Sequence, residues 1–400
     1  MMKAWQTKTI AEACQIKPPK SEARDKVTAS SLVSFLPMED MGIDVKFVHA
    51  TQTKPLSAVV GSYTYFADGD VLLAKITPCF ENGKLGIADG LKNGIGFGSS
   101  EYFVFRPDPM LSKEWLYYIL SRETFRVEGA ARMTGAVGHK RVSKEFVEGY
   151  QIPVPPLAEQ QRIVGLLDEA FKGIATAKAN AEKNLQNARA LFESHLQSVL
   201  RNNKWKWKTI GDLCDNVEYG SSAKSKAGGG VPVLRMGNIQ DGRLYWENLV
   251  YTDDKAEIHK YLLKHNDVLF NRTNSPELVG KTAIYKSDMP AIFAGYLIRI
   301  NRKEDLLDGD YLTYFLNSQI AFDHGKTVVI SSVNQANING TKLKGYPIPA
   351  PSLSEQKAIV AKLDALSEQT QRLARLYERK LAALESLKKS LLHQAFSGQL

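Results

Sequence analysis

The chain has 400 residues, with 52 Lys and Arg against 43 Asp and Glu and a formal net charge of +9 at pH 7. Its hydrophobic share of 44% and charged share of 24% are those of a soluble globular protein, and its length favours two or three domains. The positive charge favours a polyanionic partner without proving one. The three cysteines form no CxxC pair, and no apolar run reaches membrane length. We therefore expect no metal site, no disulfide framework, no membrane partner and a cytoplasmic location.

The second half of the chain repeats the first half. Blocks of similar sequence recur in the same order, at offsets that fall from 200 to 196 residues. The paired blocks are residues 8–14 and 208–214, 35–41 and 233–239, 70–75 and 267–272, 83–84 and 280–281, and 149–153 and 345–349. Such an ordered series is hard to obtain by chance, and small loop deletions explain the drift in offset. The sequence therefore predicts two related domains, at residues 1–156 and 202–352.

Each domain is predicted to mix strands with helices. Runs rich in β-branched and aromatic residues predict strands at 70–73, 102–105, 267–270 and 296–300. Helical spacing of apolar residues predicts helices at 114–126 and 310–322. Their apolar faces consist of Leu116, Ile119 and Leu120 in the first helix and of Leu312, Phe315 and Leu316 in the second. The sequence leaves the strand order open.

A proline-closed junction followed by a long amphipathic helix occurs once after each domain, at residues 157–201 and 353–400. Each helix would be about 65 Å long, and globular helices seldom exceed 25 residues. Steps of three and four predict a coiled-coil seam. Its members are Leu167, Phe171, Ile174, Ala181, Leu185, Ala188, Phe192 and Val199 in the first helix, with Lys178 and His195 in the remaining positions, and Leu363, Leu366, Leu373, Tyr377, Leu381, Leu384 and Leu391 in the second. Ser352 and Glu355 predict a capping box. The expected fold class is α+β, with two tandem α/β domains separated by two long antiparallel helices in a coiled coil of pseudo-twofold symmetry.

Polar loops in equivalent places of the two domains are candidates for DNA contact. Two such segments occur in each half, one after the strand at 70–73 or 267–270 and one before the proline-rich junction. Their side chains are of the types that hold phosphates and read base edges. The candidates are Lys75, Thr77, Lys84, Arg132, Thr134, His139, Lys140 and Arg141 in the first half and Asn271, Arg272, Thr273, Asn274, Lys281, Ser331, Ser332, Asn334 and Gln335 in the second. For any one residue, a solvated loop is about as good an interpretation.

Together these features resemble the specificity subunit of type I restriction–modification systems, over essentially the full chain. The resemblance rests on the repeated junction at 155–164 and 351–360, the half-chain repeat, the two long helices, and the segments 33–41 and 274–281. It implies target recognition domains at 1–156 and 202–352, with conserved helices at 157–201 and 353–400. It further implies a non-catalytic subunit whose domains read the two parts of a bipartite site in double-stranded DNA.

The resemblance also implies partners. Two modification subunits would dock on the helices and junctions, with Glu159, Gln160, Glu355 and Gln356 as candidate contacts, and restriction subunits would join the full complex. No cofactor is expected in this chain, because S-adenosylmethionine, ATP and magnesium would belong to the partner subunits.

Enzyme interpretations find little support in the residues. Segment 275–282 resembles the phosphate-binding pattern GxxxxGK[ST], but Ser275 replaces its first glycine and the repeat partner at 82–86 lacks the pattern. The glycine run at 94–98 has no following helix, and the acids at 253–254 have no repeat partner, so no catalytic residue is predicted. The alternative from another class is a coiled-coil scaffold whose end domains bind proteins. Steep salt dependence of DNA binding would separate the two.

Overall fold

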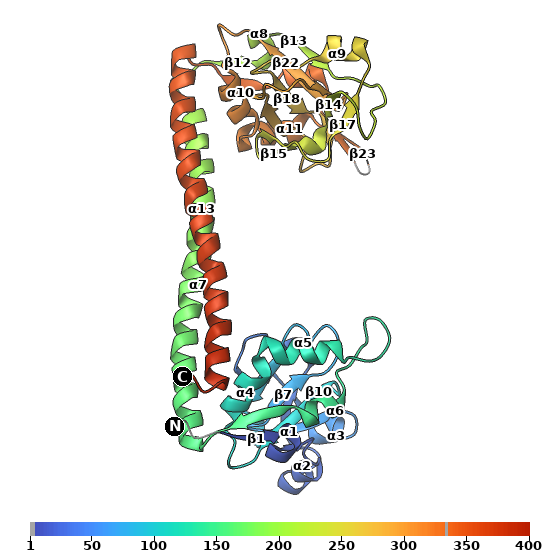
Figure 1. The fold of residues 1–400 in the computed structure, drawn as a ribbon, viewed down its shortest axis with the longest axis vertical. Coiled ribbons are helices and arrows are strands. Elements are labelled where there is room, and N and C mark those ends of the chain that lie inside the picture. The colour runs from blue at the N-terminus through green and yellow to red at the C-terminus, as the bar shows by residue number, and fades with distance from the viewer. Residues whose placement is uncertain (1–4, 333–334) are drawn as a thin grey trace. The chain divides into compact units, whose positions relative to one another are not determined.

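The computed structural model describes residues 5–332 and 335–400 and divides into two compact units (Figure 1). Unit 1 comprises the described residues up to Asn180 together with Lys380–Leu400, and unit 2 comprises Ala181–Arg379. Each unit thus contains one mixed domain and part of each long helix. The predicted α+β class is confirmed by this arrangement of helices and sheets within each unit.

The domain of unit 1 is built on two main sheets. One has the order β2-β10-β7-β8-β4, from Cys14–Ile16, Tyr102–Pro107, Val71–Ala74, Leu85–Ala88 and Phe47–Val48. The other has the order β5-β3-β9-β6, from Gln52–Pro55, Leu32–Leu36, Ile95–Gly98 and Thr64–Ala67. The pair β1–β11 joins Gln6–Thr9 to Gln151–Val154. The helices are α1 (Ile10–Ala13), α2 (Ser21–Lys26), α3 (Leu56–Val59), α4 (Lys113–Ser121), α5 (Glu123–Ala131) and α6 (Lys144–Gly149).

The domain of unit 2 repeats much of this topology. Its main sheet has the order β13-β22-β18-β20, from Cys214–Tyr219, Leu297–Arg302, Val268–Asn271 and Thr282–Ile284. The pair β12–β25 joins Trp207–Thr209 to Pro347–Pro349. Smaller sheets are β17-β14-β21 (Val250–Thr252, Val231–Leu234, Ile292–Phe293), β15-β16 (Ile239–Gln240, Arg243–Leu244) and β19-β24-β23 (Thr273–Asn274, Gln335–Asn337, Ile330–Ser332). The helices are α8 (Ile210–Leu213), α9 (Lys255–Tyr261), α10 (Gly309–Leu316), α11 (Gln319–Val328) and α12 (Gly340–Lys344).

The predicted strands are confirmed as β7, β10, β18 and β22, within one residue at each start. The predicted single helices at 114–126 and 310–322 are wrong, because each is two helices. The first breaks at Arg122, whose backbone is extended with ψ of 138°. The second breaks before α11, where the side chain of Ser318 accepts a hydrogen bond from the amide of Ala321 and so starts a new helix.

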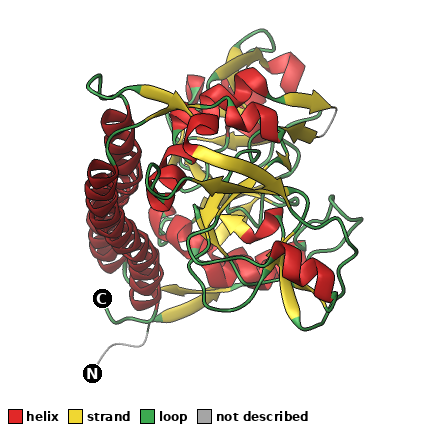
Figure 2. Ribbon diagram, turned by 90° about the horizontal axis from the view of Figure 1, so that it is seen from above, coloured by secondary structure: helices red, strands yellow, loops and turns green. Residues whose placement is uncertain are grey.

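The long helices α7 (Leu157–Leu200) and α13 (Leu353–Phe396) lie side by side in both views of the chain (Figures 1 and 2). In unit 1, Lys178 forms an ion pair of 2.7 Å with Glu385. In unit 2, Arg189 forms one of 2.9 Å with Glu378. Within unit 1, Lys388 also lies over the ring of Phe171, at 5.8 Å from its centroid, so the partner number falls as the α7 number rises and the two helices are antiparallel, as predicted.

The buried seam of the long helices differs from the prediction in three places. Lys178 is exposed. His195 is exposed, and its neighbour Leu196 is buried instead, because α7 there packs on the core of the second domain. Leu373 is 40% exposed, and Ala374 takes the inward position. The capping box of Ser352 and Glu355 is confirmed, with Ser352 N donating to Glu355 Oε2 at 2.8 Å.

The core of each domain continues into the helix pair. In unit 1, Trp115 of α4 packs on Phe396 of α13 with ring centroids 4.6 Å apart, and Leu167 of α7 joins the same cluster. In unit 2, Leu196 and Leu363 join the cluster around Tyr311 of α10. Within the described ranges, no helix is long and apolar enough to cross a membrane.

Candidate nucleic-acid interface

In unit 1 the structure brings the two predicted polar segments together. Arg141 pairs through its backbone with Thr134, at 2.8 and 3.0 Å, which closes the loop 134–141 as a hairpin. Arg141 also bridges Ile76, and the amide of Thr77 donates to the carbonyl of Lys140 at 2.9 Å. The segment that follows β7 and the hairpin before the junction therefore form one surface.

An acidic side chain holds this hairpin in place. Glu101 accepts hydrogen bonds from Arg141 Nε and Nη2, at 2.9 and 2.8 Å, and lies 4.0 Å from Lys75 Nζ. The hydrogen bonds from Arg141 lower the pKa of Glu101, and burial lowers the pKa of Lys75. Arg141 and Lys75 therefore position the hairpin, whereas His139 and Lys140 are exposed and remain candidates for phosphate contact.

Arg132 and Thr77 also make contacts within unit 1. The Arg132 guanidinium lies 3.9 Å from Glu128 and 5.1 Å from the ring centroid of Phe146, at the exposed end of α5. Thr77 donates to Glu81 at 3.1 Å. Thr134, Arg132 and the rest of the hairpin are exposed, so this surface is accessible to a large ligand.

Unit 2 contains an equivalent hairpin, whose strands pair in the same register as those of unit 1. Asn337 of β24 pairs with Thr273 of β19 and with Ile330 of β23, as Arg141 pairs with Ile76 and Thr134 in unit 1. Gln335 of β24 is exposed and pairs with Ser332 of β23, where Ser331 also lies. The candidate Asn334 lies outside the described residues.

Several second-half candidates lie beneath the surface. Asn271 is fully buried and Thr273 is 6% exposed. Arg272 stacks on Tyr219, with its guanidinium 4.8 Å from the ring centroid, and donates to the carbonyl of Gly295 at 3.3 Å. Asn274 is half-buried, and its side chain accepts from the amide of Ser275. These residues support the hairpin from behind, whereas Gln335 is exposed.

Lys84 and Lys281 occupy equivalent positions and serve equivalent internal contacts. Lys84 Nζ donates to the carbonyl of Met38 at 2.7 Å, and Lys281 Nζ donates to Gln240 Oε1 at 3.0 Å. Both side chains are half-buried. Lys84 therefore ties its sheet to the 3-10 turn Met38–Asp40, and Lys281 ties its sheet to β15, which follows the 3-10 turn Met236–Asn238.

The candidate docking residues form the start of each long helix. Gln160 is fully buried; its Oε1 accepts from Ser112 N at 2.8 Å, and its Nε2 donates to the carbonyls of Met110 and Pro155 at 2.9 and 2.7 Å. Gln356, also fully buried, makes the same three contacts with Asp308 N and the carbonyls of Leu306 and Pro351.

Both glutamines are therefore internal hydrogen-bonding residues, and neither side chain is accessible to a partner subunit. Glu355 closes the capping box with Ser352. Glu159 instead forms an ion pair with Arg162 at 2.7 Å and is half-buried, whereas Glu355 is exposed.

Sequence reasoning missed a pair that fastens each domain to its helix. Tyr118 of α4 donates to Asp168 of α7, and Tyr314 of α10 donates to Asp364 of α13 at 2.6 Å. Burial, assisted by the carboxylate, raises the pKa of both tyrosines. Both pairs are related by an offset of 196 residues, so extending the repeat comparison into the helices would have found them.

The fold and these surfaces define a class of protein with two tandem α/β domains, each presenting a duplicated polar hairpin and each packed on paired long helices. Within residues 5–332 and 335–400, no group of three or more potential ligands could hold a metal ion. The chain belongs to the family described as the type I restriction modification DNA specificity domain, whose model matches residues 2–186 and 202–381. It is a DNA specificity subunit, and as such a non-catalytic subunit, which decides against the scaffold alternative.

Known relatives agree with this assignment. The EcoAI specificity subunit of Escherichia coli is 26% identical, covering 90% of this chain and 77% of that protein. The EcoEI specificity subunit of Escherichia coli is 41% identical over 40% of this chain and 27% of that protein. The HsdS subunit from Thermoanaerobacter tengcongensis has a TM-score of 0.67 at 19% identity, covering 100% of this chain and 98% of that one.

A chain from a solved structure concerned with complex assembly and conformational transition of the type I R-M system is also similar. Its TM-score is 0.77 at 20% identity, with coverage of 99% of this chain and 98% of that one. At such identities the structural likeness shows the fold, and the family match carries the function.

Proposed function

We propose that the two domains read the two parts of a bipartite site in double-stranded DNA. The observation that carries the proposal is the duplicated hairpin, which has one backbone register but different side chains in the two domains. Unit 1 presents His139 and Lys140 there, and unit 2 presents Gln335. Equal scaffolds with unequal polar groups favour two half-sites of different sequence.

In the same proposal the paired helices set the length of the unread spacer, and two modification subunits dock on the helices and their junctions, with restriction subunits added in the full complex. S-adenosylmethionine, ATP and magnesium are then used by those partners. The long, exposed faces of α7 and α13 support this role, because a helix pair with polar outer faces offers surface beyond what its own domains cover.

Salt dependence of DNA binding tests the interface. The assembly of this chain with its modification subunits should lose affinity as salt rises, with a slope of about −0.9 per phosphate contacted. Lys140→Ala should reduce that slope by about one contact, because its ammonium stands exposed on the hairpin. Lys183→Ala, an equal loss of charge on an exposed face of α7, is the matched control and should leave the slope unchanged. An effect of Lys183→Ala without one of Lys140→Ala would contradict this placement of the DNA.

A further inference from the structure

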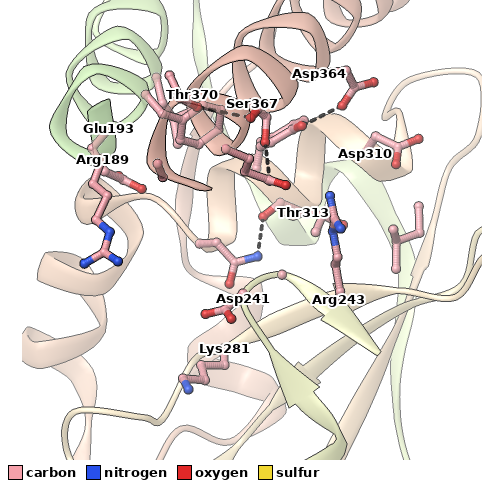
Figure 3. Close-up of a pocket in the computed structure, with 18 of the residues that line it drawn as sticks. Arg189, Glu193, Asp241, Arg243, Lys281, Asp310, Thr313, Asp364, Ser367 and Thr370 are labelled. Carbon is pink, nitrogen blue, oxygen red and sulfur yellow. Dashed lines mark hydrogen bonds between the residues drawn. The ribbon is translucent and has the colours of Figure 1, made fainter. Parts of the chain in front are cut away.

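A charged cavity of about 1040 Å³ lies beside the hairpin β15–β16 in unit 2 (Figure 3). Its lining mixes cations with carboxylates, among them Lys286 and Asp310, which pair at 2.8 Å. Arg243, the repeat counterpart of Lys46, brings a further cation near Tyr314. The chain therefore supplies charges of both signs here, and the cavity presents no single charge for a ligand to match.

A second cavity of unit 2, of about 450 Å³, is mainly apolar, and its volume is that of a small-molecule site. It lies in the core of the second domain, between helix α11 and the segment that follows β19. Glu277 and Lys326, which are exposed, also line it, so the cavity opens to the surface. Its apolar walls include Phe270, Val279, Leu316, Val329, Ile338 and the ring of Tyr346.

Unit 1 fills the equivalent place with aromatic rings. Phe125 of α5 is fully buried at the centre of this cluster. Its ring centroid lies 5.9 Å from that of Phe80, 5.5 Å from that of Phe146 and 4.8 Å from that of Tyr150. Three phenylalanines and one tyrosine thus pack together in the first domain.

Unit 2 lacks the three phenylalanines. At offsets of 197, 196 and 196 residues, their counterparts are Glu277, Ala321 and Lys342. Glu277 is exposed, and Lys342 Nζ donates to the carbonyl of Val328, at the end of α11. Ala321 leaves the centre of the cluster without a ring, and the cavity lies there.

Two other aromatic side chains of unit 2 form walls of this cavity. Phe270 and Phe322 stand where unit 1 has Leu73 and Arg126, and both line the cavity. Aromatic rings pack favourably edge to face or offset against one another. The walls therefore favour a planar aromatic ring as occupant, as in unit 1.

One polar group of the cavity wall lacks a partner. Tyr346, the counterpart of Tyr150, is 2% exposed, and its hydroxyl makes no hydrogen bond within the described residues. An added Cβ on Gly325 would lie 2.9 Å from this hydroxyl, and both residues line the cavity. Burial raises the pKa of Tyr346, so the hydroxyl stays protonated at neutral pH and can donate or accept a hydrogen bond. Buried polar groups normally have a partner, which a ligand would supply here.

We propose that this cavity binds a planar aromatic ring that carries a hydrogen-bonding group. The ring takes the place that Phe125 fills in unit 1, and its polar group bonds to the hydroxyl of Tyr346. An aliphatic ligand would leave that hydroxyl without a partner, and an ion would lose its hydration among apolar side chains.

Two sources offer such a ring: a free aromatic molecule, and a nucleobase unstacked from bound DNA. Val329 directly precedes β23, and Ile338 directly follows β24, so the cavity adjoins the candidate DNA hairpin of unit 2. The binding of a ring goes beyond the reading of DNA and does not depend on it.

The test uses the full chain with indole, and with indene as the ring of similar shape that lacks the N–H group. Binding is measured by calorimetric titration. We expect indole to bind, and Ala321→Phe to lower its affinity at least about tenfold, because the new ring fills the cavity as Phe125 does. Ala256→Phe, the same change at an exposed alanine of α9 outside the cavity, is the matched control and should leave affinity unchanged.

Tyr346→Phe keeps the ring and removes only the hydroxyl. We expect it to lower the affinity for indole about threefold to tenfold and to leave the affinity for indene unchanged. This variant decides the matter if the Ala321→Phe chain does not fold.

Three results would overturn the proposal: no indole binding to the unaltered chain, equal affinity for a folded Ala321→Phe chain, or equal affinity for the Tyr346→Phe chain. None of these measurements contains DNA, so a failure of DNA reading leaves them unaffected. The source of the ring is then found by repeating the indole titration on the assembly with modification subunits, bound to DNA that carries its recognition site. A lower affinity on DNA identifies a nucleobase as the occupant, and an unchanged affinity identifies a free aromatic molecule.

Discussion

Replacement of the buried glutamine at the start of α7 gives the sharpest test of how each domain is fixed to its helix. Gln160→Ala removes one accepted and two donated hydrogen bonds, to Ser112 N and to the carbonyls of Met110 and Pro155. Each such bond contributes about 0.5–1.5 kcal/mol net, and its loss leaves buried backbone groups without partners. We expect unit 1 to lose about 2–4 kcal/mol of stability.

Hydrogen exchange at the amide of Ser112 measures this loss within the native chain, since that amide donates directly to Gln160. Gln161→Ala, the exposed neighbour, is the control and should change stability by less than about 0.5 kcal/mol. Gln356→Ala should repeat the effect in unit 2, read at the amide of Asp308. A loss below about 1 kcal/mol, combined with weaker assembly with modification subunits, would refute the internal role and restore Gln160 as a docking contact.

Three further outcomes are expected. Removing one heptad from both α7 and α13, about 10 Å or three base pairs, should shorten the unread spacer of the methylated motif; methylome sequencing that finds the same spacer would argue against the helices as its determinant. Replacing residues 1–150 with the domain of another family member should change one part of the motif, and a change in both parts would contradict independent domains. The lowered pKa of Glu101 means that its contribution is fully present above its usual value of 4.5 and is lost as pH falls through the lowered value. Proteolysis of the hairpin 134–141 should accordingly become faster in acid, and Glu101→Gln should make it faster at pH 7; equal rates for both chains at pH 7 would show that Glu101 does not hold the hairpin.

The repeat made most of the fold accessible to sequence reasoning. Blocks such as residues 70–75 and 267–272 carry a buried strand whose hydrophobic run leaves little choice of element, and β7 and β18 follow it. The heptad pattern likewise predicted two long helices, since a stripe of that length is stable only when a second helix covers it.

Errors arose where local and tertiary contacts outweigh periodicity. Apolar spacing runs unbroken from α10 into α11, but the capping hydroxyl of Ser318 ends one helix and begins another. Heptad counting placed His195 inward, whereas packing on the second domain's core buries Leu196. Neither effect is visible in the spacing of apolar residues alone.

Candidate site residues were predictable as segments and not as individual side chains. Polar composition drew attention to 271–274, yet the pairing of β18 with β22 turns Asn271 inward, and the pairing of β19 with β24 turns Thr273 inward. Likewise, Gln160 and Gln356 were chosen because they occur at equivalent positions in the two halves. Such repetition is expected for a contact surface, but it is equally expected for a buried polar side chain that needs hydrogen-bond partners.

Some side chains are therefore the same in the two halves of the chain, and others differ, for physical reasons that the structure shows. Gln160 and Gln356 bond three backbone groups each, so a change at either glutamine would leave buried polar groups of its own unit without partners. Tyr118 and Tyr314 each bond a helix carboxylate and so hold their domain to its helix. The exposed side chains of the described hairpin strands carry no such constraint, because the backbone register of each hairpin is fixed by pairing with the strand behind it. These side chains can then differ between the domains without disturbing the backbone pairing. Two hairpins with the same backbone pairing but different exposed side chains are what a DNA site with two different half-sites requires.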